Sequence, residues 1–277
     1  MTHERTIDLA ERARAAAKGD KVAAHAILEA VQDDVYGLAL RMLGHPADAE
    51  DAAQEILVII LTHLGSFRGE SAFRTWAWRI AANHLARVRR GRRETITFEI
   101  LDERLRTGLR QVAEEPDPEE QALAREVRLR CTQAMLLSLD RELRIAYVLG
   151  DIFNLSGEEA AEVLEIDPAA YRKRLSRARV RLHDFLRGWC GVFDEANPCR
   201  CAGQVECAVE RGLLAPDDLY LSKQPTKAEL NRAADEVTGL MHVAEVMRGP
   251  STWLAPDSMV KALRELLDSQ RLELFRS

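Results

Sequence analysis

Apolar residues recur at intervals of three and four along most of the chain, which is the period of an α-helix. Over residues 7–43 this period is interrupted once, at Lys18-Gly19-Asp20, and therefore predicts two helices. Gly44-His45-Pro46 ends the second helix, and Asp48 can cap a third. A fourth helix follows a short loop, so that the pattern predicts a four-helix domain over residues 1–95.

The helical period fails over residues 96–125, where AEEPDPEE combines two prolines with acidic charge. We therefore expect an acidic, flexible linker there. A second helical domain is predicted over residues 126–188. Within it, Ser156-Gly157-Glu158-Glu159 fits a capping box, and Asp167-Pro168 places a capping acid before a proline at the first helical position. Two helices that start at these signals and are joined by a tight turn form a helix-turn-helix.

Residues 189–277 are predicted to form a small, mostly helical C-terminal extension. Helix starts are expected at Thr226-Lys227-Ala228-Glu229 and at Pro256-Asp257-Ser258. Four cysteines lie close together at its beginning: Cys190, Cys199, Cys201 and Cys207. Their spacing matches no common zinc finger, so zinc binding, redox-active thiols and simple burial stay open as alternatives, and no cofactor is required elsewhere. Cys131 is expected to be a core residue.

The composition favours helices and excludes several classes of protein. Aromatic residues make up 5% of the 277 residues, whereas Ala, Leu, Arg and Glu are abundant, so we predict an all-α fold. The start of the chain lacks the order of a signal peptide, and no apolar run is long enough to cross a bilayer, so a cytoplasmic protein without a membrane segment is expected. No nucleophile-and-base pair or phosphate-binding loop occurs in the extension, and we do not expect an enzyme.

The net charge of −6 conceals two strongly basic segments. Residues 68–93 carry eight arginines against one glutamate, and residues 172–187 carry six arginines and one lysine against one aspartate. Ordinary solvated helix faces intersperse acids four residues away from bases, and these segments do not. The charge pattern therefore predicts two separate contacts with a polyanion, most simply nucleic acid.

The later basic segment is the second helix of the helix-turn-helix, with Tyr171, Leu175, Ala178 and Leu182 as its buried stripe. The start of such a helix contacts base edges, and flanking cations bind phosphate. The candidates for reading the major groove are Ala169, Ala170, Arg172, Lys173 and Ser176. The candidates for holding phosphate are Arg174, Arg177 and Arg179.

The earlier basic segment forms a helix over residues 73–93 that follows the loop SFRGESAF and mixes tryptophans with arginines. Rings on which bases stack, beside cations that follow the backbone, suit an opened DNA strand. Trp76 is expected to lie in the core. The candidate DNA contacts are Arg68, Arg74, Trp78, Arg79, Asn83, Arg87, Arg89 and Arg90.

Two runs of the chain resemble the extracytoplasmic-function (ECF) sigma factors of bacterial RNA polymerase. Region 2 of that family is similar to PADAEDAAQEILVIILTHLGSFRGESAFRTWAWRIAANHLARVRRGRR, and region 4 is similar to LLSLDRELRIAYVLGDIFNLSGEEAAEVLEIDPAAYRKRLSRARVRL. The resemblance implies that the first domain binds the polymerase and melts the minus-ten promoter element, while the second reads the minus-thirty-five element. It places five residues on the polymerase-facing helix: Asp48, Glu50, Asp51, Gln54 and Glu55.

The resemblance further implies a sigma factor that recognises promoters and opens DNA at transcription initiation without catalysing a reaction. The implied partners are the bacterial RNA polymerase core, promoter DNA and an anti-sigma factor. The extension would regulate the factor by covering its DNA-binding or polymerase-binding surface. A second hypothesis is a helix-turn-helix regulator that acts without binding core polymerase. Promoter-dependent transcription with purified core polymerase distinguishes the two.

Overall fold

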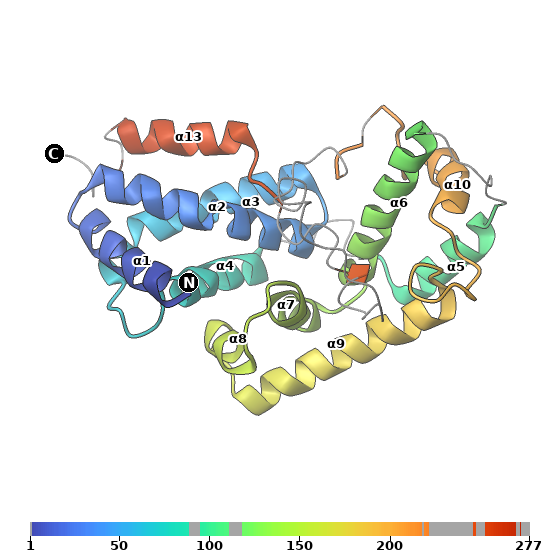
Figure 1. Cartoon of the computed structure of the whole chain (residues 1–277), viewed down its shortest axis with the longest axis horizontal. Coiled ribbons are helices and arrows are strands. Elements are labelled where there is room, and N and C mark those ends of the chain that lie inside the picture. The colour runs from blue at the N-terminus through green and yellow to red at the C-terminus, as the bar shows by residue number, and fades with distance from the viewer. Residues whose placement is uncertain are drawn as a thin grey trace.

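The computed structural model of the chain describes residues 2–88, 95–110, 118–217, 219–221, 246–247, 253–269 and 272. These residues form helices and an isolated β-bridge but no strand, which confirms the predicted all-α fold. The N-terminal helices lie on one side of the molecule and the long helix α9 runs along its lower edge (Figure 1). None of the described helices is long and apolar enough to span a lipid bilayer.

The N-terminal domain contains the helices expected from the hydrophobic pattern. They are α1 (Thr2–Ala16), α2 (Lys21–Leu43), α3 (Pro46–Thr62), the short 3-10 helix η1 (Leu64–Ser66) and α4 (Phe73–Arg87). The side chain of Asp20 accepts a hydrogen bond from the Ala23 amide and starts α2, and Gly44 ends it with a φ of 79°. Both predicted helix breaks are confirmed.

The start of α3 differs from the prediction that Asp48 caps it. The helix begins at Pro46, after His45, which makes no side-chain capping bond. Proline is already fixed at the φ of a helix and lacks the N–H that a cap would satisfy, so it starts α3 earlier. Asp48 instead lies in the first turn of α3, where the positive end of the helix dipole stabilises its negative charge.

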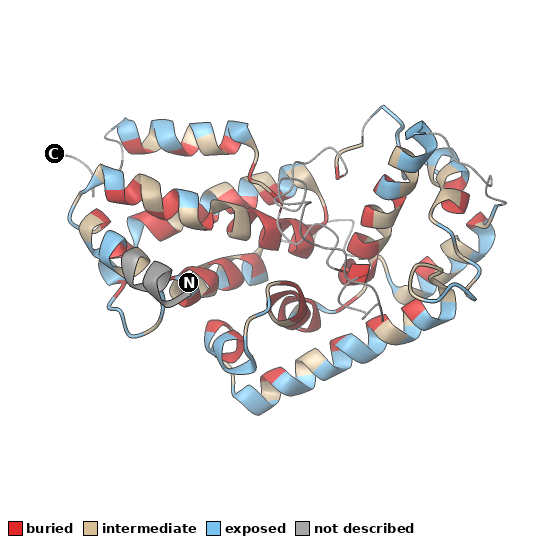
Figure 2. Ribbon diagram, viewed as in Figure 1, coloured by how far each residue is buried: buried red, intermediate tan, exposed pale blue. Residues whose placement is uncertain are grey.

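The core of this domain is centred on α2, which packs against α1, α3 and α4. Ile27, Leu38 and Leu40 of α2 are fully inaccessible to solvent, as are Ile56 of α3 and Phe73 of α4. Figure 2 shows the buried positions along these helices. Each such side chain stabilises the domain by roughly 1.5–3 kcal/mol relative to an exposed position, so α2 is the rigid element on which the other helices are placed.

Residues 96–125, predicted to be a flexible linker, contain the helix α5 (Phe98–Gly108). Thr97 caps it, since its hydroxyl accepts a hydrogen bond from the Ile100 amide. Leu101 is buried, and Trp189 donates an indole hydrogen bond of 2.6 Å to Asp102. The prediction missed α5 because its apolar positions form one short stripe, which acidic and proline-rich neighbours mask. The AEEPDPEE segment falls largely outside the described residues.

The helix-turn-helix domain follows the predicted signals closely. Its helices are α6 (Pro118–Leu137), α7 (Arg141–Tyr147), the π-helix η3 (Val148–Ile152), α8 (Gly157–Val163) and α9 (Pro168–Trp189). Ser156 and Glu159 form the reciprocal capping box that starts α8. Asp167 accepts a hydrogen bond of 2.7 Å from the Ala169 amide and starts α9. Both start signals are confirmed.

The C-terminal extension lies on two parts of the molecule. Its first part contains the 3-10 helix η4 (Ala202–Gln204) and α10 (Val205–Glu210), which pack against α5 and α6. Its last described helix, α13 (Asp257–Asp268), starts as predicted and lies along α2 and α3 (Figure 1). The helix predicted to begin at Thr226 lies outside the described residues.

The two domains meet at the C-terminal end of α2. The last carbonyl groups of a helix have no partner within it. Gln133 of α6 donates to the carbonyl of Arg41, and Arg144 of α7 donates to that of Met42. Arg144 also donates to the carbonyls of Leu136, Leu137 and Leu139 and is only 2% exposed. One guanidinium therefore completes the ends of both α2 and α6.

We predict that Arg144→Met lowers the free energy of unfolding by about 3 kcal/mol or more, because each buried carbonyl left without a donor costs about 1–3 kcal/mol. Arg181→Met is the control, since Arg181 is half exposed and pairs with an exposed Asp140. Its loss should cost at most about 1 kcal/mol. Urea unfolding followed by circular dichroism measures both. Equal losses in the two variants would contradict the prediction.

Candidate nucleic-acid interface

The start of α9 presents most of the residues predicted to contact DNA. Exposed residues on this side are Ala169, Arg172, Lys173, Ser176 and Arg177, and Ala170 is half-buried. The opposite stripe contains Tyr171, Ala178 and Leu182, which are buried, whereas the predicted stripe member Leu175 is half-buried. These five exposed residues therefore form one continuous surface on the outer side of the recognition helix.

Tyr171 fixes the orientation of that surface. Its hydroxyl donates a hydrogen bond of 3.1 Å to the carbonyl of Ala146 in α7. Burial, and after it the nearby Asp151, raises the pKa of Tyr171 to about 12. The phenol consequently keeps its proton at neutral pH and remains a donor.

Two of the predicted phosphate contacts have partners inside the protein. Arg174 forms an ion pair of 2.8 Å with Glu142. Arg179 binds both carboxylate oxygens of Asp151, one at 2.9 Å, and these hydrogen bonds raise the pKa of Arg179. Asp151 is only 8% exposed, so the pair fastens α9 to η3. Arg179 thus binds a carboxylate of the protein, whereas the sequence predicted that it holds phosphate. Charge and spacing alone do not distinguish these two roles.

The predicted contacts of the earlier basic helix, α4, are only partly accessible. Arg68 and Arg87 are exposed. Arg74 forms an ion pair with Asp34 of α2 and also donates to the carbonyl of Ala30. Arg89 and Arg90 lie outside the described residues.

The remaining three residues of that set contact the helix-turn-helix domain. Trp78 is 7% exposed, and its ring centroid lies 4.6 Å from that of Phe153. Arg79 binds Glu162 at 3.2 Å, and Asn83 donates to Glu165 at 3.2 Å. In this arrangement Trp78 is buried, Arg79 is half-buried and Asn83 is exposed, and DNA binding by these residues stays a prediction. Helical periodicity identifies the outer face of α4 but not the domain that packs on it.

Trp76 has a different environment. It packs in an aromatic group with Phe67 and Phe73, with ring centroids 5.4–5.6 Å apart. The group lies at the base of the loop before α4 and is partly buried. The expectation that Trp76 belongs to the apolar side of its helix agrees with this packing.

The predicted polymerase-facing residues lie on the outer side of α3, and the extension covers part of it. The exposed members are Asp48, Asp51 and Glu55, and the half-buried members are Glu50 and Gln54. Ser258 of α13 donates a hydrogen bond of 2.7 Å to Glu50. Arg264 of α13 pairs at 2.9 Å with Glu29 of α2. The last helix of the chain therefore binds directly beside the predicted polymerase surface.

The cysteines group differently from the prediction. Cys190 and Cys199 form the isolated β-bridge, and Cys201 follows two residues later. Cys131 interacts with all three, and burial above all, then these neighbours, raises its pKa. Cys131 is half-buried and packs against the hydrophobic core, as expected, beside this group. Cys207 is buried beside Gly108.

Among the residues that the structure describes, no group of three or more His, Cys, Asp or Glu side chains is placed to hold a metal ion. Zinc binding by Cys190, Cys199, Cys201 and Cys207 therefore stays a prediction.

Comparison with known proteins identifies the family to which this chain belongs. Two family profiles match the chain, Sigma-70 region 2 over residues 27–95 and Sigma-70 region 4 over residues 129–182. RNA polymerase sigma-H factor of Pseudomonas aeruginosa is 34% identical over 194 residues, which cover 68% of this chain and 96% of that protein. The chain belongs to the ECF family of RNA polymerase sigma factors.

Further comparisons concern one more relative and one solved structure. ECF RNA polymerase sigma factor SigW of Bacillus subtilis is 32% identical over 64% of this sigma factor and 96% of its own length. The structure of CnrH in complex with the cytosolic domain of CnrY aligns with a TM-score of 0.48 at 23% identity, covering 65% of this chain and 97% of that one.

In this sigma factor, region 2 therefore contains α2 to α4, and region 4 contains α6 to α9. Both family matches end by residue 182, so Cys190, Cys199, Cys201, Cys207 and α13 belong to an extension outside them. A helix-turn-helix regulator without core binding is not favoured, because it would not need region 2.

In the sigma factor, Arg179→Ala and Arg177→Ala compare two exposed arginines of α9, of which Arg179 binds the buried carboxylate of Asp151. We expect Arg179→Ala to lower the free energy of unfolding by about 1–3 kcal/mol, because the buried Asp151 carboxylate loses two charge-assisted hydrogen bonds. Arg177→Ala should change it by at most about 0.5 kcal/mol, since this side chain is exposed. Chemical denaturation of both proteins tests this. An Arg177→Ala variant as unstable as Arg179→Ala would refute it.

Proposed function

We propose that this sigma factor binds the RNA polymerase core through α3 and directs it to promoters through two DNA contacts. The exposed start of α9, with Arg172 and Lys173, enters the major groove of the minus-thirty-five element. The α4 helix and the loop before it hold the opened minus-ten strand. Captured bases contribute roughly 1–3 kcal/mol each, comparable with the cost of unpairing, so binding alone opens DNA and we assign the chain no catalytic step.

We further propose that the described conformation is a closed state of the factor. The observation that carries this proposal is the contact of two region 4 carboxylates, Glu162 and Glu165, with Arg79 and Asn83 of region 2. Carboxylates and phosphates bind the same donors. Promoter DNA and region 4 would therefore compete for one surface of α4.

The extension adds a second cover over region 2. Met259, Leu263 and Leu267 of α13 are buried against region 2, at most 1% exposed. The same helix donates from Ser258 to Glu50, one of the residues assigned to the polymerase surface. The helix α13 must dissociate from region 2 before a partner can bind this part of α2 and α3. In this proposal, the extension therefore regulates polymerase binding.

Leu263→Asp tests this role, with Lys261→Asp as its matched control on the exposed side of the same helix. A buried carboxylate at Leu263 should release α13, because losing a fully buried leucine costs about 1.5–3 kcal/mol. We expect Leu263→Asp to raise the apparent affinity for core polymerase about tenfold and promoter-dependent transcription accordingly. Lys261→Asp should leave both unchanged.

The assay is reconstituted transcription with purified core polymerase, together with a direct binding measurement. Unchanged or weaker core binding by a folded Leu263→Asp protein would refute the covering role of α13. Failure of the wild type and of Leu263→Asp to support any promoter-dependent transcription would instead refute the function as a sigma factor.

Three further expectations complete the proposal. We place the factor in the cytoplasm, where core polymerase and promoter DNA are found. An anti-sigma factor stays a predicted partner. Zinc or redox-active thiols in the extension stay predicted as well.

A further inference from the structure

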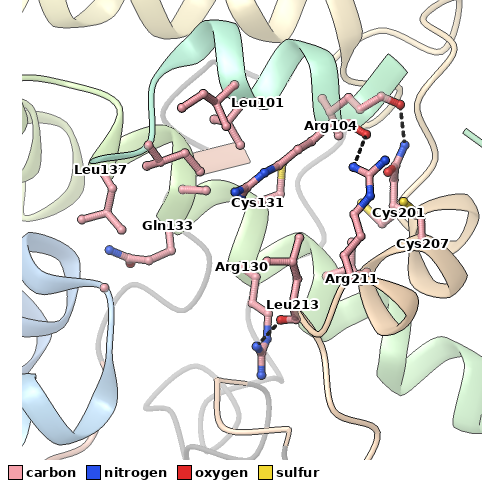
Figure 3. Close-up of a pocket in the computed structure, with 18 of the residues that line it drawn as sticks. Leu101, Arg104, Arg130, Cys131, Gln133, Leu137, Cys201, Cys207, Arg211 and Leu213 are labelled. Atoms are coloured by element: carbon pink, nitrogen blue, oxygen red, sulfur yellow. Dashed lines mark hydrogen bonds between the residues drawn. The ribbon is translucent and has the colours of Figure 1, made fainter. Parts of the chain in front are cut away.

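A cavity of about 490 Å³ lies where α5, α6 and the first part of the extension meet (Figure 3). Its volume falls within the range of roughly 300–1,000 Å³ that is usual for small-molecule sites. None of the residues assigned to DNA or polymerase lines it. The cavity therefore takes no part in the DNA and polymerase contacts proposed above.

Most of the lining is apolar. Leu101 and Leu105 come from α5, and Val127 and Ala134 come from α6. Two further lining residues belong to the few large apolar residues that are exposed: Ile100 (40%) and Leu213 (41%). Apolar surface exposed within a concave site favours the binding of an apolar ligand, because the ligand removes that surface from water.

Cysteines form part of the same lining: Cys131, Cys199, Cys201 and Cys207. Burial raises the pKa of Cys199 to about 12, and it also raises the pKa values of Cys131 and Cys201. These three thiols keep their protons at neutral pH. They therefore add polarisable, uncharged surface and do not neutralise nearby cations.

Arginines supply a positive charge that the protein does not balance. Arg130 pairs with the buried Glu126 at 2.7 Å. Arg211, in contrast, donates to neutral oxygens, the Thr107 hydroxyl at 2.6 Å and the Arg104 carbonyl at 3.4 Å. Within the described part of the chain, neither Arg104 nor Arg211 forms an ion pair. The half-buried Arg104 and the exposed Arg211 thus line one largely apolar cavity without a carboxylate partner among the described residues.

We propose that this cavity binds an amphipathic monoanion, an aliphatic carboxylate, with its head on Arg104 and Arg211 and its chain on the apolar lining. A guanidinium binds a carboxylate through charge-assisted hydrogen bonds, which are about twice as strong as neutral ones. The apolar walls exclude purely ionic ligands, because a small hydrated anion would leave them uncovered.

Such a ligand would contact three separate parts of the chain at once. It would touch α5 between the two sigma regions, α6 of region 4, and α10 of the extension. A ligand that binds only the assembled form stabilises it, and the free energy gained grows with the logarithm of the ligand concentration relative to its dissociation constant. The cavity lies away from α4 and α13, but its lining includes Gly44 at the end of α2. The inference therefore rests in part on the packing of region 4 against region 2 in the proposed closed state.

Titration calorimetry of the full-length protein tests the proposal with decanoate as the probe and decan-1-ol as its neutral counterpart. Both are used below their aggregation limits. We expect one decanoate to bind per chain, at least tenfold more tightly than decan-1-ol. Arg104→Gln and Arg211→Gln should each weaken decanoate binding at least tenfold and leave decan-1-ol binding unchanged. Arg106→Gln is the control, since Arg106 is an exposed arginine of α5 that does not line the cavity.

A second variant locates the site. Ala134→Phe fills the cavity from α6 and should abolish binding of both probes, with its fold checked by circular dichroism. Absence of saturable decanoate binding to the wild type would overturn the proposal. Equal binding of the two probes, or decanoate binding that survives Ala134→Phe, would overturn it too.

Discussion

The closed arrangement depends on helix ends in region 2 that region 2 itself cannot complete. The last carbonyls of any helix lack internal partners, and leaving them buried and unpaired is costly. In α2 the donor is Arg144, and in α4 it is Arg141, which binds the carbonyls of Leu85, Ala86 and Val88. Both arginines belong to α7, so a single short helix of region 4 caps two helices of region 2.

Arg41 connects the extension to the same point. Its guanidinium is 1% exposed and donates to the carbonyl of Gly37. It lies 5.4 Å from the ring of Phe153 in region 4 and 4.3 Å from the ring of Trp253 in the extension. A cation between two rings in a desolvated site gains roughly 2 kcal/mol or more from each. Arg41 of region 2 therefore helps to hold both region 4 and the extension. The contacts of Glu162 and Glu165 with α4 are partly exposed and individually weak, and this keeps the closure reversible.

The sequence predicted local features well and interdomain features poorly. Helix starts such as those at Ser156 and Asp167 depend on a few neighbouring residues, and the structure confirms them. The partners of Trp78, Arg179 and Cys131 were not predicted because they lie far away in the chain, and periodicity reveals only which side of a helix is apolar or charged. Buried arginines such as Arg144 were missed for the same reason, since a cation on a helix normally indicates solvent.

The central claim is that the unbound factor is closed, with region 4 packed on α4. Small-angle X-ray scattering of the full-length protein tests it most directly, with Phe153→Ala as the variant that removes the ring shared by Trp78 and Arg41. The closed arrangement predicts a wild-type scattering curve that matches the closed structure and a larger radius of gyration for Phe153→Ala. A wild-type radius as large as that of the variant, with both exceeding the closed arrangement, would contradict the claim.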